Sequence, residues 1–404
     1  MSKLHFDFLR RQIWRRLPRE FRDVLIYRLA LWFGPRLSPD AVMEEPIIVV
    51  GMLRAASGVG AAARACHDAL LEGGLEVYGI DLTEITHGDK TYTDFAFKSG
   101  RITGKGTILL HASGLHVPIA MSVLGQRVVH RKRIIAHWFW ELPKVPKNWN
   151  LAARFVHEIW VNSHFVADAV RTVSNKPVRV VPYPLKPLQE RRNESAKKSD
   201  RFFTVLLVFN VASNFTRKNP CAAITAFRRA FGDDPDARLI VKYANADVWP
   251  ASLRYMEAAA AGARNVTLIG DTLGDEGMSS LYDQADVIMS LHRSEGFGLV
   301  IAEAMQRGIP VIATNWSGNT DFFDSGVGVP VGFDLVAVED PQGFYREKEV
   351  VWAEPKIDDA ACALRILRSN NRLRAELGKA ASKRVFEMYN PGRYVGAIAE
   401  LLHK

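Results

Sequence analysis

The stretch SEGFGLVIAEAMQRGIP, residues 294–310, decides the fold of the second half of the chain. It follows an apolar run at 286–291 that is typical of a buried strand. A helical stretch then starts at Gly296–Gly298 and is expected to end near Arg307, since Gly308 suits the position after a helix. The sequence therefore predicts a strand, a tight glycine turn and a helix in direct succession.

The glycine turn has the features of an anion site. Glycines at a helix N-terminus let backbone N–H groups approach an anion closely, and the helix dipole favours negative charge there. Glu295 comes directly before the turn, and Glu303 lies about one and a half turns into the helix. We therefore expect a phosphate-bearing ligand whose hydroxyl groups lie near two carboxylates. The alternative is an ordinary charged turn with Glu303 in solvent.

Strand-like and helical segments alternate on both sides of this stretch. In the second half, apolar strand-like runs occur at 203–209, 238–243, 266–270, 286–291 and 310–313. In the first half they occur at 47–51, 77–82, 107–111, 133–138, 158–162 and 178–182. Continuous apolar strands separated by helices indicate parallel sheets covered on both faces. The fold class is therefore α/β, with two Rossmann-like domains facing a central cleft, and ligands are expected at the carboxyl ends of the strands.

A polar, charged segment, KPLQERRNESAKKSDR at 186–201, separates the two halves and is interpreted as a linker. The chain is thus divided into five parts. They are a basic amphipathic segment, an N-terminal domain, the linker, a C-terminal domain and a C-terminal helix, at residues 1–45, 46–185, 186–201, 202–383 and 384–404.

A second polar feature follows the strand at 203–209. The sequence SNFTRKNP at 213–220 carries Arg217 and Lys218, directly before a helix expected at 221–231. Arg binds phosphate through two donors at once and Lys acts as a point charge, so the pair suits a diphosphate at the cleft. An exposed basic turn is the alternative.

Two features of the first half point to the same cleft. Gly58 and Gly60, between the first strand and its helix, resemble a phosphate loop, although a tight turn explains them as well. His137 ends the fourth strand, where its side chain can hydrogen-bond a sugar hydroxyl or a phosphate. A buried structural histidine is the alternative.

The composition excludes several classes of protein. Of 404 residues, 48% are hydrophobic and 24% are charged, as in ordinary globular proteins. The three cysteines lie far apart, which excludes a disulfide scaffold or a cysteine-based zinc site and is typical of a reducing compartment. No motif suggests metal chemistry, and no apolar run is long enough for a spanning helix.

The positive charge is concentrated at the N-terminus. Residues 1–39 carry a net charge of +6 out of +9 for the chain, and aromatic and aliphatic residues are interspersed with the basic ones. This composition is typical of an interfacial helix on an anionic membrane. A pair of helices packed on the body with a solvated basic face is the alternative. Because the charge is confined to this segment, the overall basicity is a poor argument for nucleic-acid binding.

The stretch from Glu295 to Glu303 resembles the E-x7-E motif of retaining glycosyltransferases of group 1, family 4, which have the GT-B fold. Further similar sequences are RKNP at 217–220, SGNTDF at 317–322, HWFWELPKVP at 137–146 and GMLRAASGVGAAAR at 51–64. The third of these resembles a bacterial branch that acts in polysaccharide assembly. The resemblance extends from residue 47 to the C-terminus.

The resemblance implies a set of site residues. Its donor-binding positions correspond to Arg217, Lys218, Gly296, Phe297, Gly298, Glu303, Gly58 and Gly60, and its catalytic positions to His137 and Glu295. The two cations would bind the donor's diphosphate, the second glutamate the ribose hydroxyls, and the glycine turn the phosphate and sugar. Some members have a further Arg where this chain has Ala212 and Ser213, so Arg217 would do that work alone.

The implied activity is retaining, metal-independent transfer of a hexose, with mannose as a candidate, from a nucleotide-diphosphate sugar to a glycan or lipid-linked saccharide. The implied setting is cell-surface polysaccharide synthesis in the cytoplasm, at the inner face of the plasma membrane, with no cofactor and no nucleic acid. Residues 46–185 would bind the acceptor, 202–383 the donor, and 384–404 would cross back to the N-terminal domain. A nucleotide-sugar epimerase of the same fold and an inactive membrane-associated scaffold are the alternatives.

Overall fold

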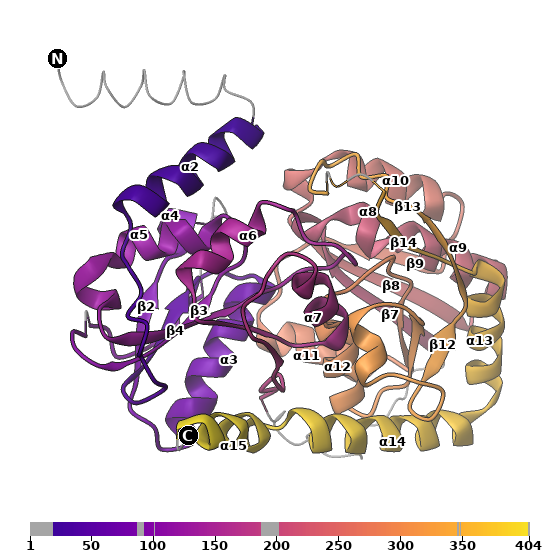
Figure 1. Ribbon diagram of the computed structural model, residues 1–404. Coiled ribbons are helices and arrows are strands. Elements are labelled where there is room, and N and C mark those ends of the chain that lie inside the picture. The colour runs from indigo at the N-terminus through magenta and orange to yellow at the C-terminus, as the bar shows by residue number, and fades with distance from the viewer. Residues whose placement is uncertain are drawn as a thin grey trace.

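The computed structural model describes residues 19–86, 93–100, 102–186, 202–345, 347 and 349–402 (Figure 1). Residues 1–18 of the basic N-terminal segment and residues 187–201 of the expected linker lie outside this description. The described residues form two α/β domains side by side. Helix α2, Arg19–Phe33, lies at the outer edge of the first domain and packs against α5, His116–Val129.

The first domain contains a six-stranded parallel sheet in the order β2-β1-β3-β4-β5-β6. In that order its strands are Val77–Asp81, Ile47–Gly51, Gly106–His111, Lys132–His137, Glu158–Val161 and Val178–Val180. Every residue of β1, β3 and β5 is buried, because the sheet is covered on both faces. The further helices of this domain are α3 Gly58–Glu72, α4 Thr83–Thr86, α6 Trp149–Ala152, η1 Ala153–Phe155 and α7 His164–Arg171.

The second domain contains another six-stranded parallel sheet, in the order β12-β11-β10-β7-β8-β9. In that order its strands are Val329–Val331, Val311–Thr314, Val287–Ser290, Phe203–Asn210, Ala237–Ala244 and Val266–Ile269. An antiparallel hairpin, β13 Phe333–Ala337 and β14 Val351–Pro355, is attached to it. The helices are η3 Val211–Ser213, α8 Phe215–Lys218, α9 Pro220–Phe231, η4 Ala246–Val248, α10 Ala251–Ala260, α11 Asp275–Gln284, α12 Leu299–Gln306, η5 Gly318–Asp321 and α13 Ile357–Ser369.

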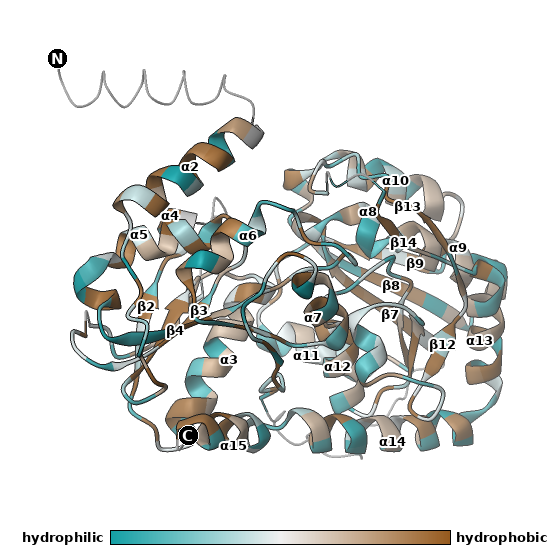
Figure 2. Cartoon of the chain, viewed as in Figure 1, coloured by the Kyte–Doolittle hydropathy of each residue, from teal (hydrophilic) through white to brown (hydrophobic). Residues whose placement is uncertain are grey.

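The expected α/β fold with two Rossmann-like domains is confirmed, and each expected strand lies within two residues of its predicted ends. Figure 2 shows the strands of both sheets as largely apolar segments between more polar helices. Three strands were not expected. β12 has only three residues, and four of the five residues of β13 are exposed, so neither has the continuous apolar character of the other strands.

The C-terminal helix expected at 384–404 is divided in the structure. α14, Asn371–Tyr389, packs against α12 and α13 of the second domain, whereas α15, Pro391–Leu402, packs against α3 of the first domain (Figure 1). The division falls before Pro391, because proline cannot continue a helix but is favoured at the first position of a new one. The crossing to the first domain therefore begins at Pro391 rather than at 384.

Candidate active site

The glycine turn predicted to bind an anion lies between β10 and α12. Gly298 has a φ of +95°, in the left-handed region that glycine favours. The hydroxyl of Ser317 accepts a hydrogen bond from the backbone N of Glu295 at 2.7 Å. A Cβ on Gly318 would lie 2.0 Å from the carbonyl oxygen of Gly296, so the two chain segments are in direct backbone contact. Ser317 and Gly318 therefore hold the turn in place from one side.

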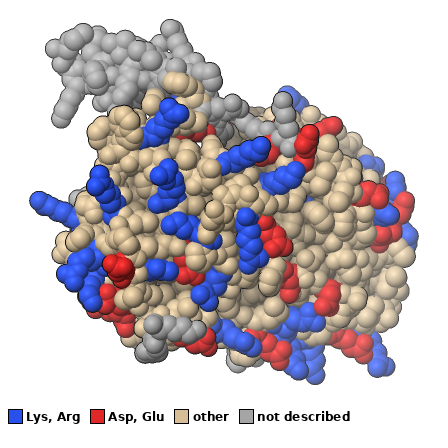
Figure 3. Space-filling view, in the orientation of Figure 1, with Lys and Arg blue, Asp and Glu red and all other residues tan. Residues whose placement is uncertain are grey.

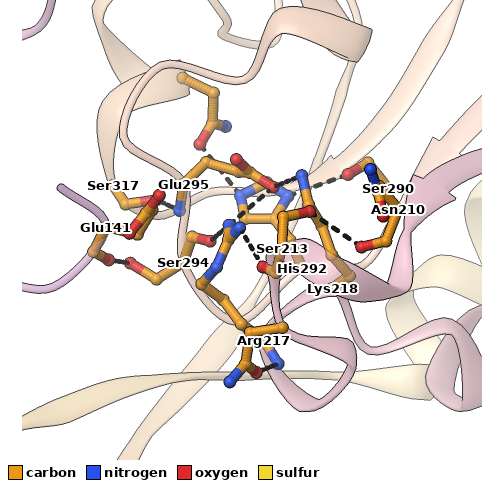
Figure 4. Close-up of polar contacts among 12 residues, drawn as sticks. Glu141, Asn210, Ser213, Arg217, Lys218, Ser290, His292, Ser294, Glu295 and Ser317 are labelled. Atoms are coloured by element: carbon orange, nitrogen blue, oxygen red, sulfur yellow. Dashed lines mark hydrogen bonds and ion pairs between the residues drawn. The ribbon is translucent and has the colours of Figure 1, made fainter. Parts of the chain in front are cut away.

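Three charged side chains meet at this turn (Figure 4). Glu295 Oε1 accepts a hydrogen bond from Lys218 Nζ at 2.5 Å and lies 3.1 Å from Nη1 of Arg217. Glu295 is only 8% exposed. Burial alone would raise the pKa of its carboxyl group, but the charges of Arg217 and Lys218 outweigh burial and lower the pKa to about 2. Glu295 is therefore ionised at neutral pH.

The two cations differ in what they can offer a ligand. Arg217 is 2% exposed, and its guanidinium donates to the carbonyl oxygens of Ser294 at 2.7 Å and Ser213 at 2.6 Å. Burial opposes its charge, but Glu295 raises the pKa of Arg217 above its ordinary value. The side chain of Lys218 is 18% exposed, and burial lowers its pKa against the attraction of Glu295. Arg217 thus braces two turns, and Lys218 is the more accessible of the two cations.

His292, which the sequence analysis did not single out, supports the turn from the sheet side. Its Nδ1 lies 3.1 Å from Ser290 Oγ and its Nε2 lies 3.0 Å from Asn319 Oδ1. Burial lowers the pKa of His292, so the ring is neutral. The only sequence signal was its position just before the SEGFG stretch, and that position does not reveal a partner 27 residues further on.

The second carboxylate of the motif has different surroundings from the first. Glu303, in α12, accepts a hydrogen bond from the hydroxyl of Tyr282 in α11 at 3.3 Å. Burial raises the pKa of Glu303, while Tyr282 and Arg307 act in the opposite direction. One carboxylate of the pair is thus held by cations and the other by a tyrosine, so the two are suited to different partners.

The first domain lies directly against the glycine turn. Ser163 Oγ donates to the carbonyl oxygen of Gly296 at 2.6 Å, and a Cβ on Gly296 would lie 2.5 Å from the carbonyl oxygen of Trp140. The hydroxyl of Ser294 also donates to the carbonyl oxygen of Glu141 (Figure 4). The expected cleft between the domains is therefore at this turn, and in the structure the domains are closed over it.

His137 ends β4 beside His111, which ends β3. The two imidazole rings stack with centroids 4.9 Å apart and planes 17° apart. Burial lowers the pKa of His137 to about 3 and that of His111 as well, so both rings are neutral. Within the described part of the chain, none of their four ring nitrogens has a hydrogen-bond partner. Two buried, neutral imidazoles with unpaired ring nitrogens therefore lie at the carboxyl edge of this sheet.

The two glycines expected in a phosphate loop have different roles. A Cβ on Gly60 would lie 2.4 Å from the carbonyl oxygen of Ala55, and the N–H of Gly60 donates to the N-cap residue Ser57 at 3.2 Å. Close backbone packing in a tight turn therefore explains Gly60. A Cβ on Gly58 would meet no atom within 4 Å, so packing does not explain that glycine.

The fold and the site define a class: two Rossmann-like domains closed over a glycine turn, with a buried carboxylate and two cations, in the GT-B architecture. Residues 191–384 match the family model described as glycosyl transferases group 1. No curated protein matches the chain. Among the described residues, no group of three or more His, Cys, Asp or Glu side chains is arranged to hold a metal ion.

Solved structures share the fold at low sequence identity. Sucrose-phosphate synthase from Thermosynechococcus elongatus is 16% identical, with a TM-score of 0.65 over 89% of this chain and 98% of that protein. Anabaena HepE, in complex with UDP and glucose, is 15% identical, with a TM-score of 0.59 over 88% of this chain and 99% of that protein. A mutant of S. aureus TarM in complex with UDP is 14% identical, with a TM-score of 0.55. That match covers 74% of this chain but 55% of TarM, so the chain spans about half the length of that relative.

Residues 191–384, slightly under half of the chain, are thus similar to the group 1 glycosyltransferases, and the two-domain arrangement is the GT-B fold. The matched residues include Arg217, Lys218, Glu295 and Glu303, so the charged cluster lies within the part that is similar to the family.

Proposed function

We propose that the protein is a retaining hexosyltransferase that moves a hexose from a nucleotide-diphosphate sugar to a glycan or lipid-linked saccharide, without a metal ion. The observation that carries the proposal is the buried cluster of Glu295, Arg217 and Lys218 at the start of α12. It lies in the half of the chain that matches the glycosyltransferase model. In this proposal the domain at 46–185 takes the acceptor and the domain at 202–383 takes the donor.

The proposed mechanism follows from the charge that builds up in the reaction. Cleavage of a sugar–diphosphate bond leaves positive charge on the anomeric carbon and negative charge on the leaving phosphate. Lys218 and the N–H groups at the start of α12 would stabilise that negative charge. The leaving phosphate would accept the acceptor's proton on the same face of the sugar, so the configuration is retained without a strong external base. Glu295 would lie beside the transferred sugar and His137 near its reacting carbon.

The structural neighbours guide the choice of donor. The complexes of Anabaena HepE and S. aureus TarM contain UDP, so UDP-hexoses are the first donors to examine. GDP-mannose is the second, since a hexose such as mannose is the candidate for transfer into a cell-surface polysaccharide. In either case Glu303 would hold the ribose hydroxyls, because its carboxyl group is half-buried and already accepts a hydrogen bond from a hydroxyl group.

Thermal unfolding with a panel of UDP, GDP, ADP and their hexose conjugates tests the donor. A ligand that binds only the folded state raises the unfolding midpoint. We expect one diphosphonucleoside to raise it, and Lys218→Ala and Glu303→Ala each to weaken binding and lower the transfer rate about tenfold or more. Matched controls are Lys383→Ala and Glu376→Ala on α14, whose side chains are 76% and 58% exposed.

The outcomes separate the proposal from its rivals. Unchanged transfer rates in both site variants would contradict the assigned roles. Epimer formation from the donor in the absence of any acceptor would favour an epimerase. Failure of every nucleotide to raise the unfolding midpoint would favour the inactive scaffold, with Ala212 and Ser213 as the reason for lost affinity.

We also propose that α2 docks on the anionic inner surface of the plasma membrane. On its outward side, Phe21, Trp32 and Phe33 are 56%, 81% and 80% exposed, whereas Tyr27 and Ala30 on the opposite side are buried in the first domain. Figure 3 shows basic side chains gathered on the face of that domain near α2. The exposed basic residues of α2, its following loop, α5 and the two residues after α5 include Arg28, Arg36, Arg127 and Arg131. Apolar residues beside basic ones suit a membrane interface.

Vesicle co-sedimentation tests this surface. We expect the protein to bind vesicles with about 30% phosphatidylserine more tightly than vesicles of phosphatidylcholine alone. The double variant Trp32→Ser and Phe33→Ser should lose most of this binding, because it removes apolar area without disturbing the core. Phe386→Ser, 67% exposed on α14, is the control. Equal binding to both vesicle types by all three proteins would dispose of the proposal. No helix within the described ranges combines the length and apolarity needed to cross a membrane.

A further inference from the structure

A second cavity lies in the C-terminal domain, behind the short helix α8. Its volume is about 690 Å³, within the range of ligand pockets in proteins. Its lining includes residues of α8, of the start of α10 and of the β13–β14 hairpin, elements that lie together in Figure 1. Residues on its wall include Phe215, Thr216 and Asn219, which belong to the same turn as Arg217 and Lys218. The cavity and the donor site are therefore on two sides of one short segment.

Aromatic rings form one wall of this cavity. Trp249 and Tyr255 stack with ring centroids 5.6 Å apart and planes 18° apart. Phe215 packs against Trp249 with centroids 5.3 Å apart and is itself 5% exposed, whereas Tyr255 is 54% exposed. The wall is thus anchored in the core at one end and open to solvent at the other. An exposed stacked aromatic pair of this kind offers a flat apolar face to a ligand.

Acidic groups form the opposite wall. Nε and Nη2 of Arg293 each lie 2.7 Å from Glu354 Oε2, and Nη1 of Arg293 donates to the carbonyl oxygen of Thr216 at 2.6 Å. The single cation on the wall is therefore neutralised, and Glu339 adds a further carboxylate. The carboxylate of Asp340 already accepts hydrogen bonds from Asn214 and from three backbone N–H groups. A polyanion such as a nucleotide diphosphate is disfavoured here, and a neutral ligand rich in hydroxyl donors is favoured.

We propose that this cavity binds a neutral saccharide unit of a long acceptor, beyond the unit that the domain at 46–185 holds for reaction. A pyranose ring presents an apolar face of C–H bonds, which suits Trp249 and Tyr255, and a rim of hydroxyls, which suits Glu339 and Glu354. The inference rests on the proposed transferase function and deepens it. The wall includes the turn that carries Lys218, so the cavity and the proposed donor site share one segment of the chain.

Saturation-transfer NMR on the full chain without nucleotide tests the cavity directly. The probes are methyl α-glucoside, methyl α-mannoside, maltose and mannobiose at millimolar concentration, with glucose 6-phosphate as the anionic comparison and uridine as the nucleoside comparison. We expect at least one neutral sugar to bind, and Tyr255→Ala and Trp249→Ala each to weaken it about tenfold. Phe386→Ala, exposed on α14, should leave binding unchanged. Addition of UDP should leave the sugar bound.

These binding measurements can contradict the saccharide site without any measurement of transferase activity. Binding of none of the four neutral sugars, or equal binding by Tyr255→Ala and the original protein, would exclude a saccharide site. Tighter binding of glucose 6-phosphate or uridine than of every neutral sugar would also overturn it. Failure of the proposed transferase itself would appear separately, as loss of the nucleotide-induced rise in the unfolding midpoint. Circular dichroism checks that Trp249→Ala still folds. Tyr255→Ala tests the same site at a mostly exposed position, where the substitution should not disturb the fold.

Discussion

Glu295 is buried and lies between the cations of Arg217 and Lys218. Because its pKa falls from 4.5 in the unfolded chain to about 2, its ionised form stabilises the fold. The sign follows from the depressed value: the stabilisation is complete above about pH 4.5 and is lost as the pH falls towards about 2. The same carboxylate that would lie beside the donor sugar thus also holds the turn around it.

We expect Glu295→Gln to reveal this contribution. At about pH 6 the variant should be less stable than the original protein by roughly 3 kcal/mol, and the difference should shrink as the pH approaches about 2. Urea unfolding curves at several pH values measure it. Glu376→Gln, at an exposed surface pair, is the control and should change little at any pH. A difference that stays constant between about pH 6 and about pH 3 would show that Glu295 stabilises by packing and not by charge.

The sequence singled out these three residues but did not predict how their side chains are arranged. Residue types and position predicted an anion site at the glycine turn beside Glu295 and, separately, a diphosphate site at Arg217 and Lys218. They left open whether RKNP was an exposed basic turn, because exposure depends on contacts distant in the chain. Arg217 is buried because its guanidinium meets the carbonyl oxygen of Ser294, 77 residues away. No local pattern encodes that contact.

At the scale of elements, α14 acts as a brace for α12, the helix that begins at the donor turn. The two helices approach so closely that a Cβ on Gly378 would lie 2.1 Å from the carbonyl oxygen of Gly308. Gly308 itself has a φ of +67°, as suits the residue just beyond the end of α12. Two glycines in contact therefore set the distance between the brace and the helix.

Replacing Gly378 with alanine should push these helices apart. We expect Gly378→Ala to lower the free energy of unfolding by about 1–3 kcal/mol, because its new methyl group meets backbone that cannot rotate away. Gly396→Ala in α15 is a matched control, since a Cβ there meets no atom within 4 Å. It should be neutral or stabilising by up to about 1 kcal/mol. Thermal unfolding of both variants measures this difference. Equal unfolding midpoints for Gly378→Ala and Gly396→Ala would contradict the close packing.

The success of sequence reasoning differs from element to element for a physical reason. β1 was predicted because its sequence, IIVVG, is a continuous apolar run, and α12 because glycines mark both of its ends. The β13–β14 hairpin was missed because four of the five residues of β13 are exposed, and its strand partner β14 follows only after a long connection. That hairpin forms part of the further cavity, which the sequence analysis accordingly did not find.

At the scale of the whole molecule, polar contacts between the domains surround the donor turn. Asp321 Oδ2 accepts hydrogen bonds from the backbone N of His164 at 2.8 Å and from its ring at 3.0 Å. Next to it, the carbonyl oxygen of Gly296 accepts from Ser163 at 2.6 Å. If the proposed donor binds at this turn, which the first domain covers, these contacts must break for it to enter. The interface is therefore expected to open and close during each reaction.

We expect Asp321→Ala to favour the open arrangement. Amide hydrogen exchange at residues 163–166 and 295–298 should rise several-fold, because two hydrogen bonds across the interface are lost. Asp324→Ala is the matched control. Its carboxylate pairs with Arg384 at 2.8 Å within the second half of the chain, so exchange at the interface should be unaffected. Equal exchange in the two variants would show that Asp321 does not hold the domains together.

The path of the C-terminal helix has a consequence for how the protein is made. Tyr394 and Ile398 of α15 are 1% and 0% exposed within an apolar cluster of the first domain, and the hydroxyl of Tyr394 lies 2.9 Å from Sγ of Cys66. During synthesis, residues 47–180 leave the ribosome long before this helix exists. The domain that is translated first therefore receives its last covering helix only at the end. A growing chain exposes the apolar surface beneath α15 until residues 391–402 emerge. Reaction of Cys66 with a thiol reagent would report that moment, because burial raises its pKa to about 12 once α15 is in place.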